Sequence, residues 1–577
     1  MSKIDPRWHY GLLVFVALAV GFWPFRELMG NYPEGADALK WVTNASPSNP
    51  DWMDWVFWRR HFIGYRPVTA FTFTVNSALT GWSPWGYRIT NAVLHIATGL
   101  AVYGLFRVLT RGRGWWAVLA AAIFYAHPAG ETVLPHIARR SYLLGSLFSV
   151  SSLIAWTVAT RDRESPVSRW ALLASVSLGA ALLSNEIAYV AVPMFPLFAL
   201  AFMDRAKPWY DSVVRCIPIL VVAVTLIALR FAVLGHFGGY HRRYFAYTRN
   251  NHNLIKEIDD TPYSMVIEAA WRYMCFPTAA SGDQALLFLG GSVGLVLAIG
   301  IVAYYGWRAV VEPALPGKEP TERLVLLMFI WLAGHTLLYA LTRNWFWRQS
   351  YPMLPPFALL VAMVARETWI RRDDLWKRVL HTVPQGLLAV SILYNAPVVT
   401  GIDEDALRGQ LKASRIVREV KANLNQEHIE SPALVYIALP VRGPSIRDAI
   451  TWIRREYQPD GIQIRWLSIL RLGSKELVDQ PTLDLAHEDG RTLIKLRSHM
   501  QFDPKLIKSL KLEGKNVVWM DRLNAPGVPH GYVYYATGDS YELAEIPPKT
   551  DQFDDENPPP QKKSKRKKKQ ADRDRAK

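Results

Sequence analysis

Several arginine residues stand next to long apolar runs of the chain, where their side chains could bind a phosphate group. Arg139 and Arg140 precede one apolar run, and Arg348 precedes another. A guanidinium holds its N–H donors in a rigid fork that matches two phosphate oxygens at once, so these three cations could form a bidentate phosphate site. In the alternative interpretation, each cation lies at the end of a membrane span and only extends its head group toward water.

Other common catalytic motifs do not occur in this sequence. There is no P-loop, no HExxH and no G-x-S-x-G, which argues against an ATP-driven pump, a zincin and an α/β-hydrolase. The two cysteines, Cys216 and Cys275, lie in or beside apolar segments, so neither a disulfide framework nor a cysteine-based metal site is expected. We find no internal repeat of the kind that marks many secondary transporters.

The apolar runs predict an α-helical polytopic membrane protein with about eleven transmembrane helices in residues 1–400. About 20 apolar residues are enough to cross the hydrocarbon core. Charged residues inside the runs are few, namely Arg215 and Arg230, so an ion relay through the bilayer is not expected. The third and tenth runs are short and could be buried or re-entrant. The expected spans lie near residues 10–29, 89–110, 114–127, 141–160, 168–185, 187–203, 211–234, 284–305, 322–342, 353–366 and 379–400.

The segments between the runs alternate between two kinds, and this alternation predicts a topology. Short basic segments face the cytoplasm by the positive-inside rule. The longer segments, residues 30–87, 127–140, 235–283 and 342–352, are rich in Trp, Tyr, His, Asp and Arg and are expected on the outer face. The first of them should form helices along the membrane surface, with its tryptophans at the interface: Trp52, Trp55, Trp58, Trp82 and Trp85.

The C-terminal part of the chain differs in composition from the membrane part. The pattern of residues 401–548 predicts a soluble α/β domain. Eleven crossings from a cytoplasmic N-terminus would place this domain on the extracytoplasmic side. Residues 549–577 predict a disordered polybasic tail, with ten Lys/Arg and two Asp in the last sixteen residues. A solvated tail is the first interpretation and contact with anionic lipid head groups the alternative; nucleic-acid binding is not expected. The charge of the tail would itself favour the cytoplasmic side, so the side of this domain stays open.

A series of short strings occurs in the order and spacing of a known family. The strings are Tyr65-Arg66-Pro67, Asn91 with His95, His127-Pro128 followed by Arg140, Ser184-Asn185-Glu186, and Arg272-Tyr273 followed by Pro277. With them the chain resembles the GT-C class of polyprenyl-phosphate-sugar-dependent glycosyltransferases, and most closely the transmembrane and tetratricopeptide-repeat O-mannosyltransferases without the repeats. The resemblance covers roughly residues 30–280, with a weaker echo around Arg348.

The resemblance implies a membrane glycosyltransferase that transfers a sugar from a polyprenyl-phosphate carrier to a protein or glycan acceptor on the non-cytoplasmic face. Such chemistry needs a carboxylate as general base on the acceptor hydroxyl and cations around the leaving phosphate. Asp37 holds the second position of the acidic pair of the family, whereas Ala36 replaces the first. Because of this replacement, an inactive GT-C scaffold that binds a lipid-linked glycan or a partner protein remains the alternative. The other acids of the loop, Glu34, Asp51 and Asp54, could substitute as the base or be solvated loop residues.

The remaining site residues follow from the same resemblance. Glu131 stands one place earlier than the family glutamate and is a candidate for orienting a metal or the acceptor, so a divalent cation is left open as a cofactor. His127 is either a site residue or a polar group at a helix end. The expected location is a bacterial inner membrane, with membrane lipids as further partners. The expected substrate-binding set is Arg66, His127, Arg139, Arg140, Glu186 and Arg348, and the expected catalytic pair is Asp37 and Glu131.

Overall fold

The computed structural model divides the chain into two compact units, Met1–Arg415 with Pro444–Trp452, and Ile416–Gly443 with Ile453–Lys577. Isolated described residues also occur between 300 and 307, between 388 and 429, and at 507, 508 and 523. The described segments are 6–32, 36–59, 61, 64–111, 114–161, 169–202, 214–235, 263–275, 321–342, 347–370, 431–438, 444–467, 469–471, 483–488, 491–497, 500–502, 517–519, 530–536 and 541–546.

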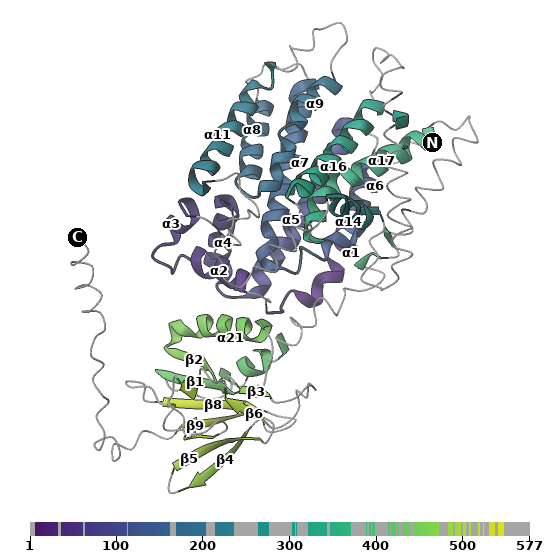
Figure 1. The fold of residues 1–577 in the computed structure, drawn as a ribbon. Helices are drawn as coiled ribbons and strands as arrows, with labels where there is room; N and C mark the ends of the chain where they lie inside the picture. The colour runs from purple at the N-terminus through teal and green to yellow at the C-terminus, as the bar shows by residue number, and fades with distance from the viewer. Residues whose placement is uncertain are drawn as a thin grey trace, which may run out of the picture. The chain divides into compact units, whose positions relative to one another are not determined.

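The first unit is helical (Figure 1). Short 3₁₀ helices stand where one long helix ends and the next begins, at η1 (Trp23–Leu28), η2 (Pro128–Gly130), η3 (Ile137–Arg139), η4 (Glu186–Ala191) and η5 (Trp347–Met353). The α-helices are α1 (Pro6–Ala19), α2 (Ala36–Ala45), α3 (Trp52–Phe57), α4 (Pro67–Thr80), α5 (Pro84–Leu109), α6 (Gly114–Ala126), α7 (Arg140–Arg161), α8 (Arg169–Leu182), α9 (Met194–Ala201), α11 (Ile217–Leu234), α14 (Tyr263–Cys275), α16 (Thr321–Thr342) and α17 (Leu354–Ile370).

Five described segments are long and apolar enough to cross a membrane: Trp8–Leu28, Pro84–Leu109, Ile137–Thr160, Ile217–Leu234 and Thr321–Leu341. The chain is therefore a membrane protein. The third expected span is the helix α6, whose 13 residues reach about 20 Å and whose side chains are largely buried. It is too short to cross the hydrocarbon core by itself. Most of the expected spans at 284–305 and 379–400 lies outside the described residues, as does the basic tail.

The helix α7 is the centre of the first unit. It packs against α5 on one side and against α8 on the other, and the ribbon shows it running through the middle of the bundle (Figure 1). Its serines can lie inside the bundle because each hydroxyl can bond a nearby carbonyl, as Ser152 Oγ does with the Ala174 carbonyl at 2.9 Å. The first turn of α7 begins at Arg140, directly after η3. Any polar residue at this end is thus held by the most heavily packed helix of the unit.

The described part of the segment 30–87, which is expected on the outer face, contains the three short helices α2, α3 and α4, which lie together at one end of the bundle (Figure 1). The longest of them, α4, has 14 residues and reaches about 21 Å, which is less than a crossing needs. Trp58 and Trp85 are exposed, as expected for an interface. The expectation for Trp55 was wrong: it is buried, because its ring packs edge-on against Trp41 at 5.3 Å.

The second unit contains a mixed sheet with strand order β2-β1-β8-β9. The strand β1 (Ala433–Ala438) is parallel to β2 (Ile462–Trp466) and to β8 (His530–Ala536), and β9 (Tyr541–Ile546) is antiparallel to β8. All six residues of β1 are buried, as befits a central parallel strand. The helix α21 (Pro444–Tyr457) and the short η6 (Gln458–Asp460) connect β1 to β2. Two smaller sheets join β3 (Ile469–Arg471) to β6 (Met500–Phe502), and β4 (Leu483–Glu488) to β5 (Arg491–Leu496) and β7 (Val517–Trp519).

Candidate active site

His127 lies between α6 and η2 and caps the start of η2. Its Nδ1 accepts a hydrogen bond from the Ala129 N–H at 3.1 Å, so the proton of the neutral ring is on Nε2, which donates to the Met274 carbonyl at 3.1 Å. Burial lowers the pKa of His127 to about 4, so the ring is neutral at physiological pH. Of the two roles that the sequence leaves open, this geometry favours the polar group at a helix end.

Glu131 ends η2 and is half-buried. Its negative charge adds to the effect of burial in raising the pKa of Tyr273 well above the ordinary value, so these two side chains are near each other. Tyr273 belongs to α14. The string around His127 and the string around Tyr273, which are separate in the sequence, therefore meet at one place in the fold. An acceptor-orienting role for Glu131 stays a prediction.

Arg139, Arg348 and His136 gather just before the first turn of α7, and we refer to them as the cationic cluster. Arg139 donates to the Thr132 carbonyl, and Arg348 Nε donates to the Tyr142 hydroxyl at 3.3 Å. The pKa of His136 lies well below its ordinary value because of burial and then because of the nearby charges of Arg139, Arg88 and Arg348. The structure thus brings together two of the three arginines that the sequence proposes for phosphate. Both are half-buried.

Arg140, the third of these arginines, has a different environment. Its side chain is fully buried, with Nε bonded to Asn91 Oδ1 at 3.0 Å and the two terminal nitrogens to the carbonyls of Thr72 at 3.1 Å and Tyr87 at 3.0 Å. The guanidinium also lies 4.3 Å from the Phe73 ring centroid. Every nitrogen has a protein acceptor, so this cation joins α4, α5 and α7. We correct the expectation for Arg140 accordingly, from phosphate ligand to structural residue.

Asp37 lies in the first turn of α2 and is exposed. The helix α2 contacts η3, the element that carries Arg139. Arg88 fixes this arrangement, because its buried guanidinium donates to the Pro135 carbonyl at 2.9 Å and to the Asn31 carbonyl, which precedes α2. The helix with the expected base and the turn with an expected phosphate ligand are thus neighbours. No part of the sequence analysis had assigned a role to Arg88.

Arg66 and Glu186, both expected to bind substrate, instead bind each other. The Glu186 carboxylate accepts from Arg66 Nη2 at 2.8 Å and Nε at 3.1 Å, and its other oxygen lies 3.1 Å from Arg230. Arg230 further donates to the carbonyls of Tyr65 at 2.7 Å and Leu182 at 2.9 Å. We call this group of three charged residues the Arg–Glu–Arg clamp. It joins the segment before α4 to η4 and α11, and it leaves Glu186 no exposed position for a substrate.

His61, which is not among the site residues expected from the sequence, holds the backbone of Arg66 in place beside this clamp. Its Nδ1 accepts from the Arg66 backbone N–H at 2.9 Å, and its Nε2 donates to the Trp55 carbonyl at 2.8 Å. Burial lowers the pKa of His61 to about 4, so the ring is neutral and can act as donor and acceptor at once. The ring stacks on Trp41 at 5.4 Å. Its position four residues before Tyr65, next to the Tyr65-Arg66-Pro67 string, is the sequence feature that could have identified His61.

Gly64 lies so close to the clamp that a side chain there has no room. A Cβ atom at this position would lie 2.9 Å from Arg66 Nε and would overlap the Glu186 carboxylate. We expect Gly64→Ala to destabilise the protein by about 1–3 kcal/mol, as overpacking of a filled site does. Gly11→Ala in α1 is the control, because nothing lies within 4 Å of its Cβ position and alanine favours a helix. Thermal unfolding of both variants in detergent measures the difference; equal midpoints would contradict the close packing at Gly64.

A metal site is not supported by the described residues. Among them, no group of three or more His, Cys, Asp or Glu side chains could hold a metal ion. Asp37 lies in α2 and Glu131 ends η2, and the structure gives them no shared ligand set.

Comparison with curated proteins gives relatives that are named protein O-mannosyl-transferases. Human protein O-mannosyl-transferase TMTC2 is 28% identical over 146 residues, which is 25% of this chain and 17% of that protein. Drosophila melanogaster Tmtc2 is 33% identical over 139 residues, 23% of this chain and 15% of that protein. The resemblance to the O-mannosyltransferases is confirmed. Human TMTC4 gives a further match, 30% identical over 140 residues, which is 21% of this chain and 19% of that protein.

The matched region is a limited part of each protein. The chain spans less than a quarter of the length of the curated relatives described above. No protein-family model matches the chain. What these O-mannosyltransferases do as whole proteins is therefore a proposal for this chain.

Two solved structures are similar at a low level. ArnT from Cupriavidus metallidurans, bound to undecaprenyl phosphate, aligns with a TM-score of 0.43 and 13% identity over 81% of this chain and 94% of that chain. The mycobacterial arabinofuranosyltransferase AftD aligns with a TM-score of 0.41 and 18% identity over 76% of this chain and 30% of that chain. Scores this low do not establish a common fold.

Proposed function

We propose that this protein is a membrane glycosyltransferase of the GT-C class that takes a sugar from a polyprenyl-phosphate carrier. The sequence relatives are named protein O-mannosyl-transferases, so mannose on a polyprenyl phosphate is the first donor to test. The acceptor is a protein or glycan hydroxyl on the non-cytoplasmic face. The polar loops and the cationic cluster support this face, because the basic segments between the other span ends indicate the cytoplasm.

The contact between α2 and η3 carries the proposal, because it places the helix of Asp37 beside the turn of Arg139. In the proposed reaction, the Asp37 carboxylate takes the proton from the acceptor hydroxyl. The acceptor oxygen then forms a bond to the anomeric carbon of the sugar while the bond from that carbon to the carrier phosphate oxygen breaks. Arg139 and Arg348 stabilise the negative charge that the phosphate gains as it leaves. Burial and then the nearby arginine charges hold the pKa of His136 well below its ordinary value, so its neutral ring adds no competing positive charge.

A non-catalytic scaffold is the second candidate function, and Ala36 favours it, because the first acid of the family pair is missing. Such a protein would bind a lipid-linked glycan through the same cations without transferring the sugar. Reconstitution in liposomes with a radiolabelled polyprenyl-phosphate mannose and a hydroxyl-bearing acceptor distinguishes the two. We expect labelled acceptor; donor binding without any transfer, tested with several sugars, would support the scaffold.

Arg348 should contribute to donor binding through its guanidinium. We expect Arg348→Ala to weaken the affinity for a polyprenyl phosphate by about 1.5–3 kcal/mol, the range for a hydrogen bond to a charged group. Arg348→Lys should recover only part of the loss, since an ammonium lacks the fork geometry. Arg26→Ala is the control, because Arg26 forms an exposed ion pair with Glu27 at 2.8 Å. Unchanged affinity for Arg348→Ala in a detergent binding assay would remove Arg348 from the site.

The finer topology is part of the same proposal. We propose about eleven spans, of which five described segments meet the length and hydropathy of a crossing. The strands between Ala433 and Ile546 belong to the proposed soluble α/β domain, and residues 549–577 to a basic tail. The proposed location is a bacterial inner membrane. Cysteine labelling with an impermeant reagent in intact cells tests the placement of the loops.

A further inference from the structure

A small cavity lies inside the first unit, one helical turn beyond Tyr142 on α7. Its volume of about 10 Å³ is near the lower limit that holds one water molecule. Four elements surround it: α7, η4, α16 and the junction of η5 with α17. Its lining residues are Gly145, Ser146, Ser149, Ile187, Ala188, Ala191, Trp331, His335, Pro352 and Pro355.

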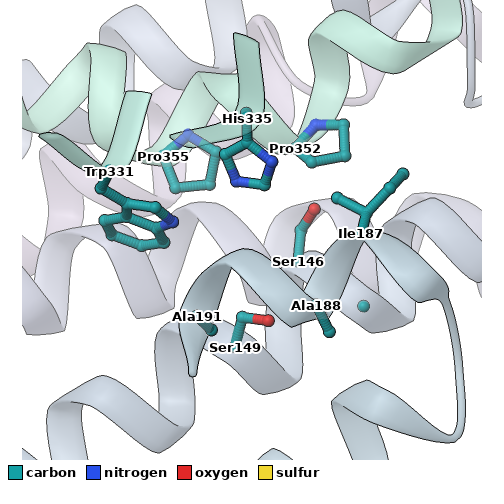
Figure 2. Close-up of a pocket in the computed structure, with 10 residues that line it drawn as sticks. Ser146, Ser149, Ile187, Ala188, Ala191, Trp331, His335, Pro352 and Pro355 are labelled. Atoms are coloured by element: carbon teal, nitrogen blue, oxygen red, sulfur yellow. The ribbon is translucent and has the colours of Figure 1, made fainter. Parts of the chain in front are cut away.

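Two polar groups of this cavity have no hydrogen-bond partner among the residues that the structure describes. His335 Nδ1 and Ser146 Oγ are both buried without one, and their side chains are 4% and 5% exposed. The Ser146 hydroxyl points toward the His335 ring, and Ser149 lies on the same side of the cavity one turn further along α7 (Figure 2). His335 and Ser146 belong to segments that are long and apolar enough to cross a membrane, where the lipid offers no partner for a buried polar group.

We infer that His335 and Ser146 form a buried site for one water molecule, which accepts from or donates to both groups. The space, the two aimed polar atoms and the hydroxyl of Ser149 fit the two to four partners that a buried water needs. The segments around the cavity are closely packed. A Cβ at Gly334 would lie 2.9 Å from Val190, and one at Gly145 would lie 3.2 Å from Asn185, so α7, η4 and α16 are already packed to contact.

The water joins α16 to α7 about one helical turn along α7 from Tyr142, which accepts the hydrogen bond of Arg348. This inference does not depend on any transferase activity. Ser146 and His335 lie far apart in the chain and in different apolar runs, so no local pattern pairs them.

Ser146→Ala tests the site with a minimal change of shape. If water bridges the two groups, the variant removes the hydrogen bond between Ser146 and the water, which is left with one partner fewer. We therefore expect the thermal midpoint in detergent to fall by about 2–4 °C. If the cavity is dry, the variant removes an unpaired buried hydroxyl, and its midpoint stays the same or rises. That second outcome overturns the inference.

A double-mutant cycle and a map give independent readouts. His335→Phe and Ser146→Ala should be coupled, so that the double variant loses clearly less than the sum of the single losses, whereas His335→Phe and Ser152→Ala should be additive. Ser152 is the matched control because it lies on α7 with its own carbonyl partner. An electron-microscopy map that resolves waters should show density within about 2.7–3.2 Å of both atoms. Additive losses for Ser146 together with an empty map would overturn the inference even if His335→Phe folds poorly.

Discussion

Replacement of Asp37 by asparagine is expected to reduce sugar transfer by about 10²–10⁴-fold, the usual loss of a positioned general base. The amide has nearly the shape of the carboxylate but cannot take the proton from the acceptor hydroxyl. Asp37 is exposed on a helix that contacts η3, and we propose that the acceptor hydroxyl binds between this helix and the cationic cluster. The variant should still fold and bind donor, because Asp37 has no ion pair among the described residues. Liposome assays of initial rate and donor affinity separate these effects.

Asp54→Asn is the matched control for this prediction. Asp54 lies in the same outer segment, in the first turn of α3, and forms an exposed ion pair with Arg59. Surface ion pairs of this kind contribute about 0–1 kcal/mol to stability, and the transfer rate of the control should stay within a few-fold of wild type. Full transfer activity in Asp37→Asn would mean that another group is the base. A loss of similar size in both variants would indicate a general effect of the outer segment.

Much of the candidate site could be predicted from the order of the short strings. The strings at Tyr65 and at Glu186 are more than a hundred residues apart, yet Arg66 and Glu186 are in contact. The strings at His127 and Tyr273 likewise meet, with ring centroids 6.1 Å apart. A resemblance of motifs predicted which residues are important to this fold. It did not predict whether each of them binds a substrate or another part of the chain.

Arg139 and Arg140 show why that distinction needs a structure. The two residues are adjacent in sequence and have the same chemistry, but Arg139 ends η3 and Arg140 begins α7. Because successive residues of a helical segment point in different directions around its axis, Arg139 reaches the half-buried cationic cluster, whereas Arg140 enters the packed interior, where three acceptors surround it. A one-dimensional pattern contains no information on this rotation. The arginine that best matches the family string is thus the structural one.

Arg230 had a sequence signal that could have been followed further. A charged residue in an apolar run is costly unless it has a partner, so an intramembrane arginine predicts a nearby carboxylate or a set of carbonyls. Glu186 begins the short helix after α8, and it is the carboxylate that Arg230 binds. The sequence thus predicts that Arg230 needs a partner but does not identify it. The partner follows from the packing of α11 on α8.

Replacement of Glu186 by glutamine is expected to destabilise the protein by about 3–5 kcal/mol, the cost of removing one partner of a buried ion pair. The carboxylate is buried and its charge balances two arginines, of which Arg230 is 2% exposed and Arg66 half-buried. Glutamine would keep one acceptor oxygen but leave the buried Arg230 and the half-buried Arg66 to repel each other. We therefore expect lower expression and a lower thermal midpoint in detergent. Glu27→Gln, on an exposed ion pair, should change stability by at most about 1 kcal/mol.

The double variant Glu186→Gln with Arg66→Gln separates a charge effect from a loss of shape. It restores the net charge of the Arg–Glu–Arg clamp, since it removes one negative and one positive group together. If charge balance is the function of Glu186, the double variant should be more stable than Glu186→Gln alone, because coupled residues are not additive. If Glu186 instead bound the sugar or its carrier, Glu186→Gln would fold with wild-type stability and lose donor affinity. That result would return Glu186 to the substrate-binding set, where the sequence alone had placed it.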